Sequence, residues 1–296
     1  MNSKNTRNQI KVIDETSTES DRFDRQKRIA GWDQVKIKDA KVMVIGAGAT
    51  GNEVVKNLTL CGIGTIYLID YDLIESSNLS RCVLFNYTNS LEKYKADVIK
   101  DTCQNLNPEV KIIPIKQELN SIDKDLYKRS DVICSCLDNL EARLEANNYA
   151  YYYNVPFVDS GIDEFFGSVQ VVYSGDKDAA CLQCGISDKD LEIMWKKFSC
   201  TGQELSSTNS ETERIIASII TTTSIIGGIQ SQQVLKILLG ISTFNQFRHW
   251  NPKIGEPLLG KQLIYNGITN EFIIISKLKD PTCWTCSFKD KKHGGK

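Results

Sequence analysis

The sequence predicts an α/β fold in which a mostly parallel sheet is continued by antiparallel strands. Three observations support this. In the first half of the 296-residue chain, short apolar runs alternate with segments of helical periodicity, a pattern typical of parallel strands joined by crossover helices. A glycine-rich turn joins the first apolar run to the first helical segment. In the second half, half-polar strand patterns and two C-x-x-C pairs indicate antiparallel strands and a compact cysteine region.

The prediction of the fold rests mainly on the segment between residues 41 and 72. A buried strand, Val42 to Ile45, leads into a turn with the pattern G-x-G-x-x-G, and a helix is expected over Asn52 to Leu60. The next apolar run, Thr65 to Ile69, ends at Asp70. The glycines of the turn are Gly46, Gly48 and Gly51.

This order of elements predicts a Rossmann-like nucleotide-binding fold. Glycines let the backbone approach a phosphate closely, and the N-terminus of the following helix presents free N–H groups. A carboxylate at the end of the second strand, here Asp70, can accept hydrogen bonds from ribose hydroxyls. The turn by itself would fit other α/β proteins; the strands, helix and acid in sequence make the prediction specific.

Composition narrows the class of protein. The apolar fraction of 41% and the charged fraction of 25% are ordinary for a soluble globular chain, and a net charge of −1 favours neither nucleic acid nor a membrane as partner. We find no apolar run of about 18 residues. Residues 1–20 are polar, lack the apolar core of a signal peptide and are expected to be disordered. The ten cysteines include several within apolar patterns, which favours a reducing, cytoplasmic location.

The following elements continue the α/β alternation. A helix starts near Lys93 or Lys95 and reaches Leu106, and another ends at Tyr153. Further strands are expected over Val110 to Ile115, Asp131 to Cys136, Val155 to Asp159 and Ser168 to Tyr173, with a loop from Ser160 to Gly167.

Polar residues follow the carboxyl ends of these strands, where α/β folds bind ligands. Asn78 and Arg81 are three residues apart, so one helical turn can direct both at a single phosphate. Asp138 follows a strand directly and is suited to hold magnesium beside a triphosphate. The alternative is a helix N-cap, which either Asp138 or Asn139 could provide.

The four cysteines of the two C-x-x-C pairs are the candidate metal ligands. They are Cys181, Cys184, Cys283 and Cys286. Two such pairs complete a closed tetrahedral Zn²⁺ site, which would tie the end of the chain in place rather than catalyse. The alternative is a set of unlinked surface thiols.

The C-terminal third starts with a polar segment and continues with a long apolar helical pattern. The pattern runs from Ile215 to Gly240; Gly227-Gly228 indicates a break or a close packing contact, and Gly240 a helix end. Late strands are expected over Phe247 to Trp250, Gln262 to Asn266 and Glu271 to Ile275. We expect a single domain over 21–286 with an embedded cysteine and loop region at 181–213, and a flexible tail at 287–296.

Several motifs in order resemble one family. They are RFDRQ from Arg22, GAGATG from Gly46, IDYDLIESSNLSR from Ile69, LEKYKAD from Leu91, CLDN from Cys136, DSGIDEFFG from Asp159, FSCT from Phe198 and the two C-x-x-C pairs. The chain resembles the adenylyltransferases that activate ubiquitin and ubiquitin-like proteins, including the bacterial ThiF and MoeB enzymes.

The resemblance implies ATP-dependent activation of a C-terminal glycine and assigns roles by motif position. Gly46, Gly48, Gly51, Asp70 and Asp72 would bind the nucleotide, with Asp70 on the ribose; Asn78, Arg81 and Lys95 would hold the phosphates, with Lys93 the less favoured lysine; and Asp138 would bind Mg²⁺. Arg25 would be lent across a homodimer to the partner's ATP, and Cys200 would take the modifier from AMP as a thioester.

Other functions stay open at this stage. The protein substrate would be a ubiquitin-like modifier, followed by a conjugating enzyme, or a sulfur-carrier protein that is adenylated without a cysteine thioester. A nicotinamide dehydrogenase shares the glycine turn but leaves Asn78, Arg81, Asp138 and the cysteine pairs unexplained. A catalytically silent binding partner is the fourth alternative.

Overall fold

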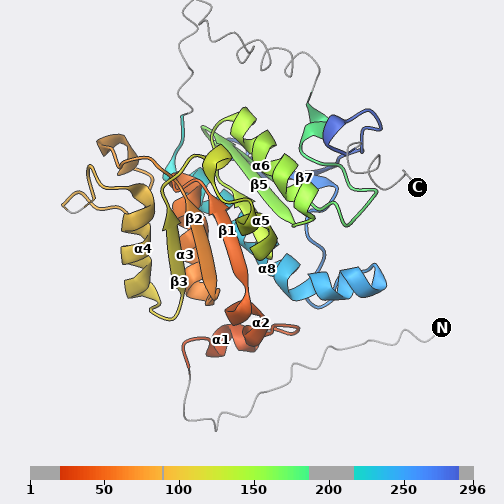
Figure 1. The fold of residues 1–296 in the computed structure, drawn as a ribbon, viewed down its shortest axis with the longest axis horizontal. Helices are drawn as coiled ribbons and strands as arrows, with labels where there is room; N and C mark the ends of the chain where they lie inside the picture. The colour runs from red at the N-terminus through yellow and green to blue at the C-terminus, as the bar shows by residue number, and fades with distance from the viewer. Residues whose placement is uncertain (1–20, 89, 187–216, 287–296) are drawn as a thin grey trace, which may run out of the picture.

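The computed structural model describes residues 21–88, 90–186 and 217–286 (Figure 1). Within these residues the strands form one sheet in the order β3-β2-β1-β4-β5-β6-β7-β8. Neighbours from β3 to β5 are parallel and those from β5 to β8 antiparallel, which confirms the predicted fold class. The strands are β1 Lys41–Ile45, β2 Thr65–Ile69, β3 Lys111–Ile115, β4 Val132–Ser135, β5 Phe157–Asp163, β6 Phe166–Val172, β7 Lys261–Asn266 and β8 Glu271–Ser276.

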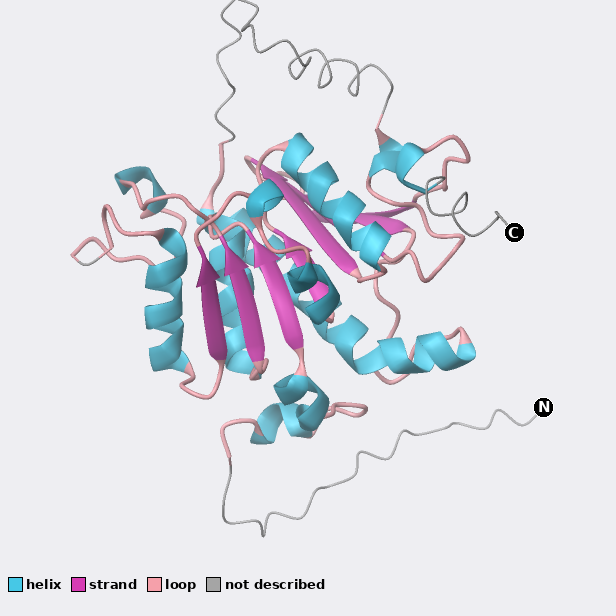
Figure 2. Ribbon diagram, viewed as in Figure 1, coloured by secondary structure: helices cyan, strands magenta, loops and turns pink. Residues whose placement is uncertain are grey.

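Helices lie on both faces of the sheet (Figure 2). The described α-helices are α1 Asp24–Lys27, α2 Gln34–Asp39, α3 Ala49–Cys61, α4 Lys95–Leu106, α5 Asp125–Arg129, α6 Leu140–Tyr153 and α8 Ile220–Phe247. One apolar cluster joins α2, α3, α4 and α8 to the sheet, and a second joins α5, α6 and the four paired cysteines to it.

The first strand shows why its run is apolar throughout. Val42 and Val44 belong to the first cluster, whereas Met43 and Ile45 belong to the second. Successive side chains of a strand point to opposite faces, so a strand covered on both sides has no polar position. All four of these residues are at most 1% exposed.

Helix α8 differs from the prediction at Gly240. The helix does not end there but continues to Phe247. A β-carbon at Gly240 would lie 2.9 Å from Cε3 of Trp250, so this glycine makes room for the Trp250 ring. That ring stacks on Phe244 with centroids 4.7 Å apart, and the strand predicted from Phe247 to Trp250 is wrong.

Two further predictions concern strands β5 and β6 and helix α8. The loop predicted from Ser160 to Gly167 is wrong, because β5 continues to Asp163 and β6 begins at Phe166. The Gly227-Gly228 pair marks a close packing contact and not a break: a β-carbon on Gly227 would lie 2.5 Å from that of Glu53, where α8 crosses α3.

In the described ranges no helix is both long and apolar enough to cross a membrane, although α8 has 28 residues. The predictions made for residues 1–20 and 287–296, for Cys200 and for most of the 181–213 region lie outside the described residues.

Candidate functional site: the carboxyl edge of the parallel strands

The glycine turn joins β1 to α3 at the carboxyl edge of the sheet. Gly46 has φ of +96°, a conformation open to glycine, and its N–H donates to the carbonyl of Ile69 at 2.9 Å. The next N–H, that of Ala47, donates to Oδ2 of Asp70 at 2.7 Å. Asp70 therefore fixes the turn as well as facing the edge where a ligand would bind.

The three glycines of the turn serve different purposes. A β-carbon at Gly51 would lie 2.0 Å from the carbonyl oxygen of Gly46, and one at Gly46 would lie 2.5 Å from that of Cys136. Both are required by internal packing. A β-carbon at Gly48 would meet nothing within 4 Å, so Gly48 faces open space at the N-terminus of α3. The free N–H groups of a helix start attract anions, and this opening lets an anion approach them.

Asp70, Asp72 and Lys95 form the charged part of this edge. Nζ of Lys95 lies 2.7 Å from Oδ2 of Asp72, and the Lys95 side chain is only 12% exposed. Burial lowers the pKa of the Lys95 ammonium, but the hydrogen bond to Asp72 and the charges of Asp70 and Asp72 outweigh it, and the pKa is raised. Lys95 therefore keeps its positive charge beside the glycine turn.

Burial has the dominant effect on Asp70. It raises the pKa of the carboxyl group, although the N–H groups of Ala47 and Asp72 and the charge of Lys95 act in the other direction. Oδ1 of Asp70 accepts from the N–H of Asp72 at 2.9 Å. Both carboxylate oxygens are thus held in a fixed orientation.

Asn78 and Arg81 lie in the segment after β2. Asn78 ends a short 3₁₀ helix, Ser76–Asn78, where its Oδ1 accepts from the N–H of Glu75 at 3.0 Å. The N–H of Arg81 donates to the carbonyl of Asn78 at 3.1 Å, and its guanidinium reaches back to the carbonyl of Ser77. Asn78 is buried and Arg81 is half-buried, so the pair has a structural part to play besides any ligand contact.

Asp138 stands between β4 and α6, and the structure decides which residue caps that helix. Oδ1 of Asn139 accepts from the N–H of Ala142 at 2.8 Å, so Asn139 is the N-cap. Asp138 is exposed beside it and is not used for capping. Burial and then the negative charges of Asp72, Glu118, Asp70 and Asp138 raise the pKa of the Tyr71 hydroxyl.

The sequence analysis did not predict a buried ion pair that lies at the same edge. Arg143 of α6 holds Asp159 of β5 through two hydrogen bonds, Nε to Oδ1 at 3.0 Å and Nη2 to Oδ2 at 2.5 Å. Asp159 is 1% exposed. Nε2 of Gln170 adds a third bond to Asp159 at 3.2 Å, and Nζ of Lys277 donates to Gln170 at 2.9 Å. The sequence offered a signal for this pair only in part: it shows an arginine within a predicted helix and an aspartate at the end of an apolar strand. Only the fold brings the two side chains together.

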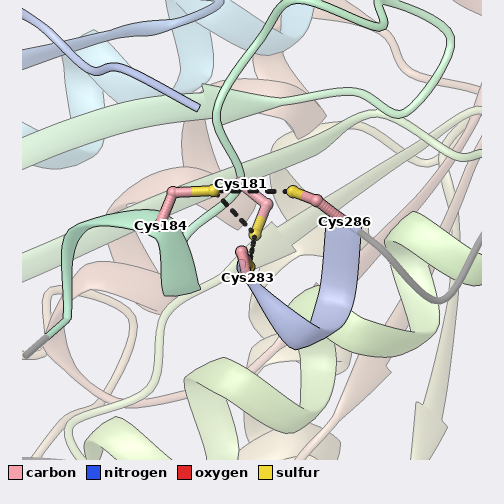
Figure 3. A group of neighbouring side chains, drawn as sticks. All are labelled: Cys181, Cys184, Cys283 and Cys286. Carbon is pink, nitrogen blue, oxygen red and sulfur yellow. Dashed lines mark hydrogen bonds between the residues drawn. The ribbon is translucent and has the colours of Figure 1, made fainter. Parts of the chain in front are cut away.

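The two C-x-x-C pairs meet, as the spacing predicts. The sulfur atoms lie 3.7 Å apart for Cys181 and Cys184, 3.6 Å for Cys181 and Cys283, and 3.5 Å for Cys184 and Cys286 (Figure 3). All four lie within 4.8 Å of one another. Tetrahedral coordination with Zn–S bonds of about 2.3 Å separates the sulfurs by about 3.8 Å, so the donor set and its spacing fit zinc. The four cysteines are buried or half-buried, so the alternative of unlinked surface thiols is wrong.

Arg25 is an exposed residue of the short helix α1. Its side chain is 92% exposed and has one long contact, 4.0 Å from Nε to a carboxylate oxygen of Asp24. Lys93 is exposed beside the half-buried Lys95, and Lys95 is the one that contacts Asp72. The structure therefore brings together the glycine turn, Asp70, Asp72 and Lys95, and leaves Arg25 free to contact another molecule.

The comparisons with known proteins agree with this arrangement. The profile of the ThiF family matches residues 22–285, and the chain belongs to the ThiF family. It is 24% identical over 269 residues to the molybdopterin-synthase adenylyltransferase of Escherichia coli, covering 90% of this chain and 95% of that protein. It is 27% identical over 275 residues to ubiquitin-like modifier-activating enzyme 5 of Bombyx mori, covering 87% of this chain.

The match with solved structures concerns the fold. The crystal structure of E. coli MccB with ATP superposes with a TM-score of 0.69 at 23% identity, covering 92% of this chain and 75% of that one. The chain spans only 62% of the Bombyx mori relative.

Proposed function

We propose that this protein is an ATP-dependent adenylyltransferase that activates the C-terminal glycine of a ubiquitin-like modifier. The observation that carries the proposal is the opening at Gly48, the one glycine of the turn whose missing side chain leaves open space within the described structure. It lies at the start of α3, on the edge that also carries Asp70 and Lys95. Family membership and relatives named adenylyltransferases and activating enzymes support the same reading.

The residues at the edge take distinct parts in this proposal. The turn Gly46-Gly48-Gly51 lines the nucleotide, Asp70 and Asp72 hold its ribose side, and Asn78, Arg81 and Lys95 bind phosphate oxygens. Asp138, exposed and not needed as a cap, supplies a carboxylate for Mg²⁺. The four cysteines hold a structural Zn²⁺, for which their sulfur spacing is suitable.

The reaction brings two anions together. An oxygen of the substrate's C-terminal carboxylate attacks the α-phosphorus, a new O–P bond forms, and the bond from the α-phosphorus to the bridging oxygen breaks to release pyrophosphate. Positive groups that hold the phosphates in line offset the repulsion and spare the entropy of orienting the reactants. No general base is required, because the attacking carboxylate is already ionised.

A second step is proposed at Cys200. Its thiolate attacks the acyl carbon, a C–S bond forms, and the bond to the AMP oxygen breaks. The modifier would then pass to a conjugating enzyme. We further propose a homodimer in which Arg25 reaches the partner's nucleotide, which suits its 92% exposed side chain, and a cytoplasmic location.

The alternative is adenylation of a sulfur-carrier protein without a cysteine thioester. It is supported by the similarity to the molybdopterin-synthase adenylyltransferase of E. coli, which is 24% identical over 269 residues. The two readings share the adenylation step and differ in the use of Cys200.

ATP–pyrophosphate exchange with glycine-ending ubiquitin-like proteins from the same genome tests the adenylation. We expect exchange that depends on one of these proteins and falls by about a hundredfold or more in Asp138→Ala, because a metal-binding carboxylate stabilises transition-state charge. Glu141→Ala is the matched control, an exposed carboxylate in the first turn of the same helix, and should exchange normally. Absence of exchange with every candidate would remove the proposal.

A non-reducing gel then separates the two readings. An adduct of the modifier that disappears with thiol and is absent in Cys200→Ser, but present in Cys61→Ser, supports the thioester. Normal exchange without an adduct in wild type supports the sulfur-carrier reading.

A further inference from the structure

Strand β8 forms one edge of the sheet, and no strand lies on its outer side in the described part of the chain. All six residues of β8, Glu271–Ser276, are exposed, and four of them in succession are large and apolar. An unpaired apolar edge is a template for pairing with another chain, and proteins commonly protect such an edge with proline or with charges in the strand. The run from Phe272 to Ile275 contains neither, so this edge is suited to strand addition.

The backbone groups on the outer side of β8 follow from its register with β7. The N–H of Lys277 donates to the carbonyl of Gly260 at 2.9 Å, and this pair continues the β7–β8 register. In an antiparallel pair, residues alternate between directing both backbone groups at the neighbouring strand and directing both away from it. The odd-numbered residues of β8 therefore face β7. Phe272, Ile274 and Ser276 direct their N–H and C=O groups to the outer side.

The charges around β8 are complementary to those of a second copy. The segment 271–277 has a carboxylate at one end, an ammonium group at the other and mainly apolar residues between them. In an antiparallel pair of two copies centred on Ile274, each Glu271 lies opposite Lys277 of the partner subunit, and all three outward-facing residues pair within the two strands. Opposite charges at facing positions stabilise such a pair. Nζ of Lys277 bonds to Oε1 of Gln170 at 2.9 Å, and an ammonium group has further hydrogens for a carboxylate.

The apolar side chains match in the same register. Each Ile273 lies opposite Ile275 of the partner subunit, at a position where facing residues exchange no backbone bonds and their side chains come closest. Ile273 is 52% exposed and Ile275 is 41% exposed. Pairing would therefore remove four isoleucine side chains from water on one face of the joined sheet, between the two pairs of opposite charges.

This edge is remote from the proposed nucleotide site. β8 is five strand positions away from β1, which corresponds to about 24 Å. Two copies joined at β8 would have their glycine turns about eleven spacings apart, or about 50 Å. Arg25 belongs to the first half, because Gln26 of the same helix donates to the carbonyl of Cys61 at the end of α3. Contact through β8 is therefore additional to the homodimer proposed above, and it does not depend on adenylation.

We infer that two copies of this chain associate through their β8 strands, as an antiparallel pair centred on Ile274 that joins the two sheets into one. The pair is two-fold symmetric, so the same residues serve on both sides. Backbone hydrogen bonds and apolar burial supply the binding, and Glu271 with Lys277 of the partner subunit fixes the register.

The first test removes the outward N–H of Ile274 and leaves the β7 ladder intact. Proline lacks this donor and is tolerated in an edge strand where the N–H faces solvent. We expect Ile274→Pro to weaken association about thirtyfold in sedimentation equilibrium, because the pair loses two hydrogen bonds at its centre. At a concentration where wild type is paired, the mass of the variant should be half or less. Ile274→Val keeps the N–H and should associate as wild type does.

A second variant tests the register. Glu271→Lys places two ammonium groups opposite each other at both ends of the pair, and Glu271→Gln is the matched neutral control. We expect Glu271→Lys to weaken association about fivefold at low salt, with Glu271→Gln between it and wild type. The difference should become smaller at 1 M salt, because exposed charges are then screened.

A third measurement uses wild type alone. Hydrogen exchange of the β8 amides is followed over a hundredfold range of protein concentration. Ile273 and Ile275 donate toward β7 and should be protected throughout. Phe272 and Ile274 should exchange rapidly in dilute protein and become protected as the concentration rises.

The outcomes decide the inference without reference to catalysis. Equal masses of wild type and Ile274→Pro, or a Phe272 and an Ile274 amide that exchange rapidly at every concentration, overturn the pairing of copies. Unchanged association of Glu271→Lys at low salt overturns the register. Protection of the two amides only after a glycine-ending ubiquitin-like protein is added would assign the edge to another molecule and also overturn the inference.

Discussion

The two edge strands of the sheet, β3 and β8, differ in how well they are covered by the rest of the chain. β3 is packed against α4, and its Ile112 is 6% exposed. The N–H of Lys111 and the carbonyl of Ile115 bond toward β2, so Pro114 directs its missing N–H to the outer edge. β8 has four consecutive apolar residues that are between 41% and 58% exposed, Phe272, Ile273, Ile274 and Ile275.

This difference shows how each half of the sheet is stabilised. The parallel half is buried on both faces by helices, and its edge is protected against further pairing by proline. In the antiparallel half, β6 still packs against α8, whereas β8 is exposed, and the four cysteines join the segment after β6 to the segment after β8. The first half therefore depends on apolar packing around the glycine turn, and the outer part of the second half depends also on the cysteine cluster.

The largest stability effect is expected at the cysteine cluster. We expect about one zinc per chain by elemental analysis, and loss of that zinc in Cys283→Ser with a decrease in Tm of about 10 °C, equivalent to about 6 kcal/mol for a chain of this length. The half-buried Cys61 provides the control, since Cys61→Ser should keep the metal and the Tm. A zinc-free wild type with unchanged Tm in the variant would contradict the role given to the cluster.

The glycine turn gives the next effect and tests the packing of the first half. Gly51→Ala should lower the free energy of unfolding by about 4 kcal/mol, because its methyl group would meet the Gly46 carbonyl. Gly48→Ala should change the free energy of unfolding by less than about 0.5 kcal/mol but weaken ATP binding, since the methyl group enters the opening. Urea unfolding and nucleotide titration measure both. Equal destabilisation by the two variants would show that Gly48 is also a packing glycine.

The two edges can be compared directly with one substitution. Ile112→Lys buries an ammonium group and should lower the free energy of unfolding by about 3 kcal/mol. Ile274→Lys, at a position 58% exposed, should change it by less than about 0.5 kcal/mol and reduce association measured by light scattering. Similar losses in urea unfolding would mean that β8 is covered in solution.

The smallest effect concerns pH and Asp70. Burial raises the pKa of this carboxyl above its ordinary value of 3.8, so its contribution to folding is present at low pH and is lost as the pH rises through the raised value. The stability advantage of wild type over Asp70→Asn should therefore shrink from pH 4 toward neutral pH. An advantage that grows over this range, measured by urea unfolding, would indicate a lowered pKa instead.

The sequence by itself determined the local features. Apolar runs bounded by glycine and aspartate placed β1, β2 and α3, and C-x-x-C spacing identified the four cysteines whose sulfur atoms meet. These features depend on neighbours within a few residues, where periodicity and backbone freedom act directly.

Tertiary structure decided the features that depend on distant residues. Only packing shows that Gly51 is required by Gly46 while Gly48 is not, and only the Trp250 ring explains why α8 passes through Gly240. The length of β5 and the ion pair between its Asp159 and Arg143 of α6 arise from contacts between separate elements. Because burial and the pairing of charges are properties of the assembled chain, no local pattern could have determined them.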